Sequence, residues 1–475
     1  MATPTTTTST RTSGTVTTSA SALYALISLF FMWGFITCMN DILIPSFKEM
    51  FTLTYFQAFL VQFAFFGAYF IGSLIFFVIS ATIGDPIQAL GYKNGILGGL
   101  GLSAIACLMF YPAAANHSYG FFLGALFTLG LGFTLLQIAA NPYVAIMGSP
   151  ETAPSRLNLA QAFNSFGTTI APLIGGYFIF EFFADAAGNP TPEGLQTLYP
   201  IFAVVFILVG VFMFFMPLPK VESDPIEPGI GALRFPHLRL GMVAIFMYVG
   251  GEVVVGSALI NFFGLPEIMG MDKTRGDIFL AFYWGGAMIG RFAGAVAMGD
   301  TVQSVRKYAT MLGVALAAFA FIFFAAWFKS KFTLTFGEVW PFLLLIVLNF
   351  AGFYAGQSMP GRTFAVFSGA NLLLLLVAVF ASGPVAFWSI IGIGLFNSIM
   401  WSNIFTLSID GLGKYTSQGS SLLVMMILGG ALLPPLQGII ADKIGLQISF
   451  VLAMICYAYL LYYGAAGYKA GKDRL

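Results

Sequence analysis

Apolar runs separated by short polar breaks extend along almost the whole chain. Most of these runs contain about 20 residues, the length that an α-helix needs to cross the roughly 30 Å hydrocarbon core of a bilayer. The pattern therefore predicts an all-α, polytopic membrane protein. We expect fourteen spans, at residues 23–46, 57–83, 94–112, 119–147, 157–183, 197–217, 240–263, 277–298, 306–328, 338–358, 363–381, 385–409, 416–440 and 447–467.

One long polar stretch, residues 218–239, interrupts this pattern and is rich in proline and charge. It indicates a linker between an amino-terminal bundle of six spans, residues 23–217, and a carboxy-terminal bundle of eight spans, residues 240–475. Residues 1–22 are rich in threonine and serine and carry a single arginine, so we expect a disordered tail there.

Basic residues predict the orientation, because lysine and arginine accumulate on the cytoplasmic side of membrane proteins. With the amino terminus inside, 14 of the 20 basic residues lie on the cytoplasmic side and 6 lie outside. We therefore expect both termini and the linker in the cytoplasm, and a multi-pass protein of the cell inner membrane.

The composition excludes several classes of protein. With 59% hydrophobic and 8% charged residues, and a mean hydropathy of +0.90, the chain is not a soluble domain. The net charge is +1 and no basic run occurs, so no nucleic-acid partner is expected. The isolated Cys38, Cys107 and Cys456, and His117 and His237 in predicted loops, match neither a metal site nor a nucleophile with its base. We expect no enzyme, no metal and no prosthetic cofactor.

Two acidic residues, Asp41 and Glu252, lie well inside predicted spans, whereas the other 17 of the 19 fall in loops, termini or span ends. A charged group inside the bilayer is costly, so it marks an ion or substrate pathway unless neighbouring helices satisfy it structurally. "FMWG" at 31–34 and "FMYVG" at 246–250 open the first spans of the two halves. Superposing them puts Glu252 about one turn from the level of Asp41.

Amide side chains form the second polar set within the spans. They could bind a polyhydroxylated solute, because an amide both donates and accepts hydrogen bonds, or they could hold helices together. "GFTLLQIAANPYV" and "GLFNSIMWSNIF" occupy comparable places in the two halves, and as a group the amides favour a polar cavity. The set is Asn40, Gln62, Gln137, Asn141, Asn158, Gln161, Asn164 and Asn397.

Further side chains suggest supporting roles. Trp33, Tyr143, Phe163 and Trp401 could offer a flat apolar surface to a sugar ring. Within "GGAMIGRFAG", the four-residue glycine spacing predicts close helix packing. We expect Arg291 of that stretch to snorkel or pair near the cytoplasmic end of its helix.

Six stretches together give a specific resemblance that covers both halves. "NDILIPSF", "FQAFLVQFAFFGAYFIG", "LQIAANPYV", "RLNLAQAFNSFG", "NSIMWSNIFTLSIDGLG" and "QGSSLLVMMILGGALLPPLQG" resemble the fucose:proton symporter family of the major facilitator superfamily, and within it the glucose/galactose and N-acetylhexosamine branch. The resemblance implies two six-helix bundles and monosaccharide:cation symport by alternating access. It implies that Asp41 couples the cation, and that Asn158, Gln161 and Asn164 line the sugar cavity.

Two departures from the family pattern matter. Fucose-type members have a glutamate where this chain has Gln137, whereas Glu252 matches an acid of the glucose/galactose branch. The family has twelve helices, so the spans at 306–328 and 338–358 are additional. Because the insertion contains an even number of spans, it leaves the sidedness of everything after it unchanged.

These observations lead to one functional hypothesis with open alternatives. We expect a monomeric symporter of a hexose, fucose or N-acetylglucosamine, with Asp41, Glu252 and Gln137 in cation coupling and the amides above, Gln137 included, in sugar binding. A co-transported proton is favoured over sodium. Loss of a titrating group at position 137 argues for sodium, whereas Glu252 could restore a second proton site. Export of small apolar compounds is an alternative.

Overall fold

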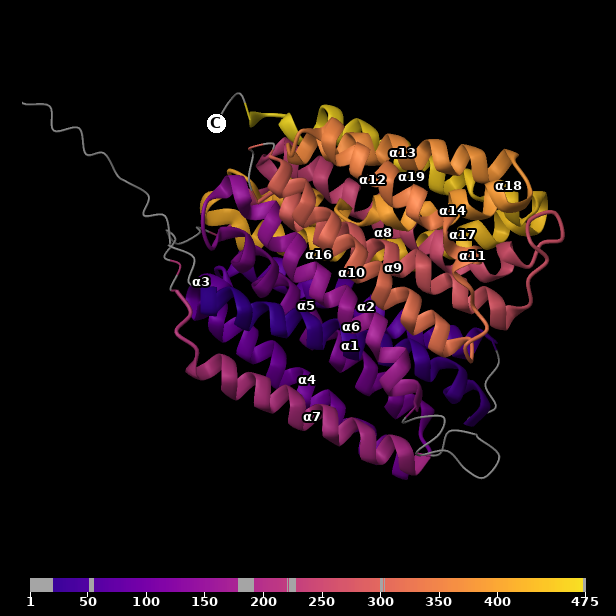
Figure 1. The fold of residues 1–475 in the computed structure, drawn as a ribbon. Coiled ribbons are helices and arrows are strands. Elements are labelled where there is room, and N and C mark those ends of the chain that lie inside the picture. Colours follow the sequence, from indigo (N-terminus) through magenta and orange to yellow (C-terminus); the bar gives the residue numbers. More distant parts are fainter. Residues whose placement is uncertain are drawn as a thin grey trace, which may run out of the picture.

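The computed structural model describes residues 20–50, 55–177, 192–219, 221, 228–299, 302 and 304–472. Helices make up the first half of the chain (Figure 1), and a short 3-10 turn, Pro150–Thr152, precedes α6. These helices are α1 (Ala20–Met50), α2 (Tyr55–Thr82), α3 (Pro86–Leu90), α4 (Tyr92–Ala115), α5 (Tyr119–Ile146), α6 (Ala153–Tyr177) and α7 (Pro192–Phe215).

The second half is also helical, and several of its spans are built from two consecutive helices. The break between α14 and α15 falls at Ser398 and Ile399, and the 3-10 turn Met426–Leu428 joins α16 to α17. The helices are α8 (Pro236–Phe263), α9 (Lys273–Ala297), α10 (Val305–Lys329), α11 (Phe336–Val339), α12 (Pro341–Gly356), α13 (Pro360–Phe380), α14 (Gly383–Asn397), α15 (Met400–Ile409), α16 (Thr416–Met425), α17 (Gly429–Ile444), α18 (Leu446–Ser449) and α19 (Val451–Ala465).

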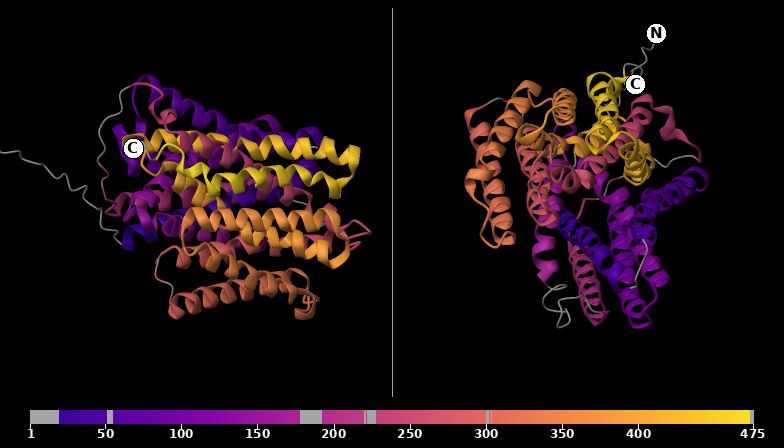
Figure 2. Two further views of the ribbon diagram at one scale, coloured as in Figure 1. Left: turned by 90° about the horizontal axis from the view of Figure 1, so that it is seen from above. Right: turned by 90° about the vertical axis from the view of Figure 1, so that its right-hand side faces the viewer.

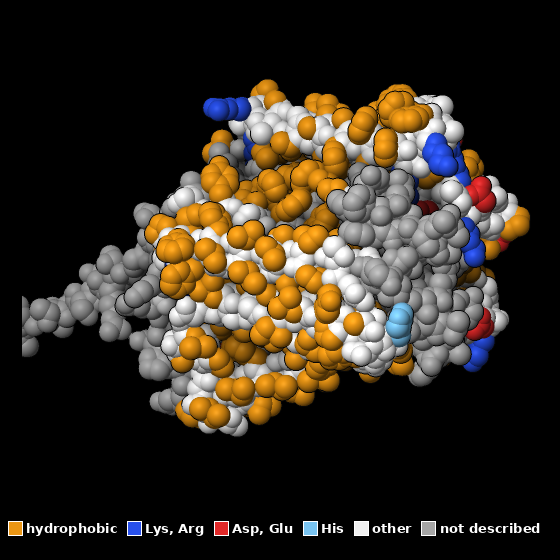
Figure 3. Space-filling view, turned by 90° about the horizontal axis from the view of Figure 1, so that it is seen from below, with side chains coloured by type: hydrophobic (Ala, Val, Ile, Leu, Met, Phe, Trp, Pro, Cys, Tyr) orange, Lys and Arg blue, Asp and Glu red, His pale blue; other side chains and the backbone are white. Residues whose placement is uncertain are grey.

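The predicted all-helical membrane fold is confirmed. Among the described residues, 13 helices or helix pairs are long and apolar enough to cross a membrane. The more polar α6 packs along α1 and α9 and adds a fourteenth helix of spanning length. In Figure 3, apolar side chains cover the middle of the face shown and charged side chains gather toward its ends, as expected for a protein embedded in lipid.

Helix packing reveals a repeat within the chain. In the first half, α1 packs on α6, α4 packs on α5 and α7, and α2 packs on α5. In the second half, α8 packs on α17, α13 packs on α14 and α19, and α9 packs on α14. Helices α8, α9, α13, α14, α17 and α19 thus repeat the plan of the first six spans. Helices α10 and α12 have no counterpart in the first half, so they are the additional pair.

This additional pair lies at the edge of the second half in both views of Figure 2. Helix α10 packs on α9 and also reaches α6, while α12 packs on α13 and α14. The amide of Asn349 on α12 donates to the Leu395 carbonyl of α14 at 3.1 Å. Large apolar side chains such as Phe324 and Val347 remain exposed. One side of the hairpin therefore attaches to the protein, and the other is suited to lipid.

The two bundles meet through α6 and α9, through α2 and α16, and through α5 and α16. The end of the molecule where α7 ends and α8 begins is called the linker end below. There, the Asp85 carboxylate accepts hydrogen bonds from the Ile87 amide (2.8 Å) at the start of α3 and from the hydroxyls of Ser80 and Ser417. Gln418 donates to Ser80 (3.3 Å) and to the Gly229 carbonyl (3.1 Å). These contacts join α2, α16 and the end of the linker.

Candidate functional site

The predicted site residues lie on six helices. Asn40 and Asp41 belong to α1 and Gln62 to α2, and their side chains lie outside the described part of the structure. The remaining residues are Gln137 and Asn141 on α5, Asn158, Gln161 and Asn164 on α6, Glu252 on α8 and Asn397 at the end of α14.

Most buried polar atoms without a hydrogen-bond partner lie on helices that take part in the contact between the bundles. Within the described ranges, ten residues have such side-chain atoms, and seven of these residues lie on α2, α5, α6, α15 and α16. Each unpartnered polar atom costs about 1–3 kcal/mol in a dry interior. The seven residues are Ser73, Asn141, Asn158, Trp401, Ser402, Asn403 and Ser420.

Two of these residues show most clearly where unused hydrogen-bonding capacity lies. Asn141 is fully buried, and neither its amide nitrogen nor its oxygen has a partner among the described residues. Asn158 faces the opposite bundle, because its amide nitrogen lies 3.5 Å from the Met298 sulfur just beyond α9. Its oxygen has no partner in the part of the chain that the structure describes. Hydrogen-bonding capacity is therefore available at the bundle interface, where a polar solute would use it.

Asn164 has a different environment. Its amide nitrogen donates to the Phe30 carbonyl of α1 at 3.0 Å. The helices approach closely here, since a Cβ added at Gly34 would lie 2.1 Å from the Asn164 carbonyl oxygen, and one at Gly167 would lie 2.2 Å from that of Phe31. In this arrangement Asn164 joins α1 to α6, which is the structural alternative for an intramembrane amide.

Glu252 lies in a cluster of tyrosines inside the carboxy-terminal bundle. The Tyr248 hydroxyl, one turn earlier on α8, donates to the Glu252 carboxylate at 2.7 Å. The Tyr283 hydroxyl of α9 lies 3.2 Å from the Glu252 backbone carbonyl, to which it donates. The carboxylate is thus held by a neutral hydroxyl, and no lysine or arginine of the described residues forms a salt bridge with it.

Asn397 organises this cluster. Its amide oxygen accepts from the Tyr457 hydroxyl at 2.6 Å and from the Asn371 amide at 2.9 Å. Its amide nitrogen donates to the Tyr283 hydroxyl at 3.3 Å, and its backbone carbonyl accepts from Tyr248 at 3.4 Å. These partners all belong to α8, α9, α13 and α19, so the hydrogen bonds of Asn397 are made within its own bundle.

Sequence reasoning did not identify the tyrosines or Asn371. The four-residue spacing of Tyr248 and Glu252 could have indicated that pair, because such residues share a helix face. Tyr457 and Asn371 lie 60 and 26 positions from Asn397, and no local pattern connects them. The prediction that His237 lies in a loop was wrong. Helix α8 begins at Pro236, and the His237 ring is buried 3.0 Å from the Asp410 carbonyl.

Arg291 of α9 spans the bundle interface. Its Nε donates to the Ser398 carbonyl at 3.1 Å, and its Nη1 donates to the Ser165 hydroxyl of α6. The Tyr248 hydroxyl that donates to the Glu252 carboxylate also donates to the Asn397 carbonyl, which is next in the chain to the Ser398 carbonyl bound by Arg291. Arg291 therefore pairs inside the protein and does not snorkel.

The aromatic residues singled out in the sequence take different positions. Tyr143 stacks on Tyr92, with ring centroids 5.4 Å apart, and donates to the Pro219 carbonyl at the start of the linker at 2.6 Å. Phe163 packs edge-on against Phe292 across the bundle interface. Trp401, whose indole nitrogen has no partner among the described residues, lies on α15, a helix that contacts α5 and α6.

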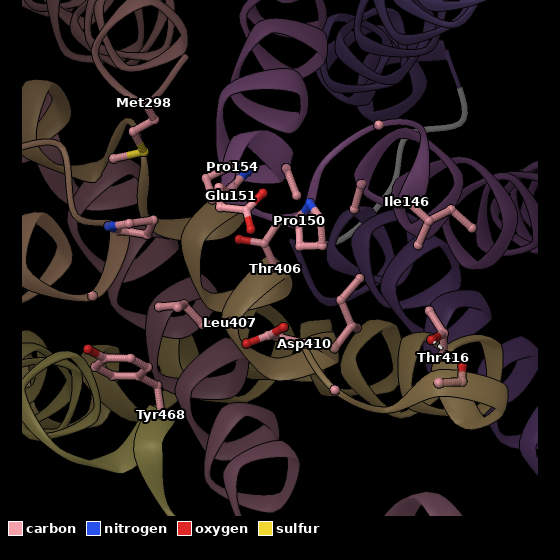
Figure 4. A pocket seen from close by; sticks show the side chains of 18 of the residues that line it. Ile146, Pro150, Glu151, Pro154, Met298, Thr406, Leu407, Asp410, Thr416 and Tyr468 are labelled. Atoms are coloured by element: carbon pink, nitrogen blue, oxygen red, sulfur yellow. Dashed lines mark hydrogen bonds between the residues drawn. The ribbon is translucent and has the colours of Figure 1, made fainter. Parts of the chain in front are cut away.

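A cavity of about 1410 Å³ opens at the linker end between the two bundles (Figure 4). Its lining includes Met298, the neighbour of Asn158, so the cavity reaches the edge of the polar interface. Glu151 and Asp410 approach it from opposite bundles. A backbone amide and the Ser149 hydroxyl lower the pKa of Glu151, whereas the Asp410 carboxylate forms a salt bridge with Lys472 at 2.6 Å. No group of metal-ligating side chains occurs in the described part of the chain.

Comparison with known proteins agrees with this architecture. Residues 22–371 match the sequence profile of the Major Facilitator Superfamily. The chain is 41% identical to a glucose/galactose transporter of Brucella abortus over 455 residues, covering 94% of each protein. It is 31% identical to the L-fucose-proton symporter of Escherichia coli, with 91% of this chain and 90% of the relative covered.

Solved structures give the same result. The crystal structure of the E. coli fucose:proton symporter FucP superposes with a TM-score of 0.72 at 27% identity, covering 94% of this chain and 98% of the other. A bacterial homologue of the iron transporter ferroportin, at 11% identity and a TM-score of 0.64, shares the fold alone. The chain belongs to the major facilitator superfamily.

Proposed function

We propose that this protein is a monosaccharide:cation symporter that works by alternating access. The relatives named above as glucose/galactose and fucose transporters match over nearly their whole length, which supports a sugar as the substrate. Two bundles that repeat one plan and meet along a polar interface suit a mechanism in which the bundles rock about a central site.

The observation that carries the proposal is the set of unpartnered polar atoms at that interface. Sugar hydroxyls both donate and accept hydrogen bonds, so a bound sugar can supply partners for atoms of this kind, such as those of Asn141, Asn158 and Trp401. An apolar drug would leave these atoms unpartnered and lose about 1–3 kcal/mol for each. Gln161, buried on the same helix as Asn158, is a further contact in this proposal. The cavity at the linker end is the proposed route of release.

Cation coupling is assigned to Asp41 and Glu252, with a proton as the driving ion. Gln137 cannot titrate, so the amino-terminal bundle offers one carboxylate and the carboxy-terminal bundle offers the other. The L-fucose-proton symporter among the relatives favours the proton. A sodium-driven cycle would instead use Asp41 and the Gln137 carbonyl as oxygen ligands.

Uptake into liposomes tests this proposal. Labelled D-glucose, D-galactose, L-fucose and N-acetylglucosamine are offered with a pH gradient, with a sodium gradient and with neither. We expect accumulation of at least one sugar driven by the pH gradient. The variant Asp41→Asn should lose accumulation but keep some exchange between two filled sides, because an amide keeps the shape and cannot carry the proton. Normal gradient-driven uptake by this variant would remove Asp41 from the coupling role.

The proposed membrane arrangement places a monomer in the inner membrane with both termini in the cytoplasm. Lysine and arginine counts support this sidedness. A cysteine introduced at Lys329 should be labelled from outside, and one at Arg362 from inside. Labelling of both from one side would contradict the arrangement.

A further inference from the structure

The contact between the bundles along α6 and α9 contains two polar bonds of different kinds. Near the linker end, the Ser155 hydroxyl of α6 donates to the Ala295 carbonyl of α9 at 2.5 Å. Deeper in the membrane, the Arg291 guanidinium of α9 donates to the Ser165 hydroxyl of α6. The first bond joins neutral groups. The second carries a full positive charge and can respond to other charges.

Glu252 is the carboxylate near this arginine. Two tyrosines bond to Glu252, Tyr248 on α8 and Tyr283 on α9, and Tyr457 on α19 joins the same cluster through Asn397. From α14 it meets the neutral Asn397 through these hydroxyls. Arg291, bound to the Ser398 carbonyl directly after Asn397, supplies the positive charge in this group. The ionised and protonated forms of Glu252 therefore differ mainly in how strongly they attract Arg291.

We propose that Arg291 is a positioning residue that links the charge on Glu252 to the closure of the α6–α9 contact. When Glu252 is ionised, it draws the guanidinium away from Ser165 and loosens the contact between the bundles. When Glu252 is protonated, the guanidinium stays on Ser165 and the bundles remain joined. A proton on one bundle thereby favours one arrangement of both, which is the coupling free energy that symport requires.

Two further contacts restrict which part of Arg291 can move. The Ser398 carbonyl holds Nε of Arg291 at 3.1 Å, so the guanidinium can pivot about this fixed bond. Gly290, the preceding residue, packs so closely on α14 that an added Cβ would lie 2.2 Å from the Ser398 hydroxyl. The backbone of α9 is thus held against α14, and the movement is left to the arginine side chain.

A disulfide across the α6–α9 contact can report its closure without any sugar. A Cβ added at Gly299 would lie 3.1 Å from the Ser155 hydroxyl, so Ser155→Cys with Gly299→Cys places two thiols in bonding range. Alanine replaces Cys38, Cys107 and Cys456 to leave one pair. Cross-linking of the parent and of Glu252→Gln is compared across a pH series, and at pH values where the parent carboxyl is ionised we expect Glu252→Gln to raise the cross-linking rate about fivefold.

A double-mutant comparison decides whether the effect passes through the arginine. In backgrounds carrying Ser165→Ala or Arg291→Gln, Glu252→Gln should leave the cross-linking rate unchanged, because the link is already broken. The same fivefold change in these backgrounds, or no change in the parent, would overturn the proposal. Arg291→Lys should retain part of the effect, since it keeps the charge and loses the planar guanidinium.

The inference rests on the proposed symport function, and transport provides the second test. We expect Ser165→Ala to reduce gradient-driven accumulation about fivefold while sugar exchange between two filled sides stays within about twofold. Ser155→Ala removes a hydrogen bond between the same two helices and should change neither gradient-driven accumulation nor sugar exchange. Equal losses in both variants would reduce Arg291 to a packing role. Absence of all sugar transport in the parent would refute the symport function, whereas the cross-linking result would still test the link.

Discussion

Helix α5 and the pair α14 and α15 occupy equivalent places in the two halves, yet their amides have opposite environments. On α5, Asn141 is fully buried and both of its amide atoms are unpartnered among the described residues. On α14, Asn397 is equally buried and both of its amide atoms are used by neighbouring helices. Burial of an amide therefore does not reveal its role. Its hydrogen-bond partners distinguish a group available to a solute from one that supports the bundle.

The same comparison reveals a shared feature. Superposing Gln137 on Asn397 aligns Asn141 with Trp401, because each lies four residues, or about one turn, further along. Both Asn141 and Trp401 have buried polar atoms that find no partner within the described ranges. The two halves thus present unpartnered groups from equivalent positions, as expected for a site on the axis that relates them.

The largest effect is expected from Asn397→Leu. Leucine has a similar volume but leaves the Tyr457 hydroxyl and the Asn371 amide without their acceptor, so the free energy of unfolding should fall by about 3 kcal/mol. Thermal unfolding in detergent measures this change. Ser389→Ala, which removes only a bond within α14, serves as the control. Unchanged stability of Asn397→Leu would show that the cluster does not hold the bundle together.

Asn141→Leu should give the opposite result. The substitution removes two unpartnered polar atoms, so stability should be equal or higher, whereas sugar affinity should fall by about 2 kcal/mol, or roughly thirtyfold. Half-saturation in sugar exchange and thermal unfolding are measured on the same preparation. A destabilised variant with unaltered affinity would place Asn141 among the structural amides.

Gln161→Ala is expected to weaken sugar affinity by about 1–2 kcal/mol while leaving ion dependence nearly unchanged, because the loss of one donor and acceptor pair does not alter charge. Half-saturation for the transported sugar, measured at two pH values, tests this expectation. Asn164→Ala provides the comparison, since that amide bonds to α1. Equal half-saturation for Gln161→Ala and the parent would exclude a direct sugar contact.

The smallest effect is expected from Tyr457→Phe. This change removes one of the two donors to the Asn397 oxygen and leaves Asn371 in place, so the loss of stability should be about 1 kcal/mol. Comparing the stability of Tyr457→Phe, of Asn397→Leu and of the double variant measures the coupling energy between these two side chains. Strict additivity would mean that the two side chains act independently.

The sequence predicts the spans well because lipid imposes a length and an apolar composition that each segment shows locally. Even the additional pair, α10 and α12, is predicted, since its apolar runs resemble any other span. The candidate site is predicted only in part. Amides and carboxylates within spans can be identified by type, but Asn164 and Asn397 differ from Asn141 only through residues far away in the chain. Arg291 illustrates the same limit, because its partner Ser165 lies 126 positions away.

The break between α14 and α15 has a consequence for how the bundle is assembled. A continuous helix consumes its own carbonyls, whereas the last turn of α14 leaves them available. The Leu395 carbonyl accepts from Asn349 of α12, that of Asn397 accepts from Tyr248 of α8, and that of Ser398 accepts from Arg291 of α9. One irregular turn at mid-membrane depth therefore accepts hydrogen bonds from three other helices. The inserted hairpin attaches to the bundle through one of these carbonyls, which an unbroken helix would not offer.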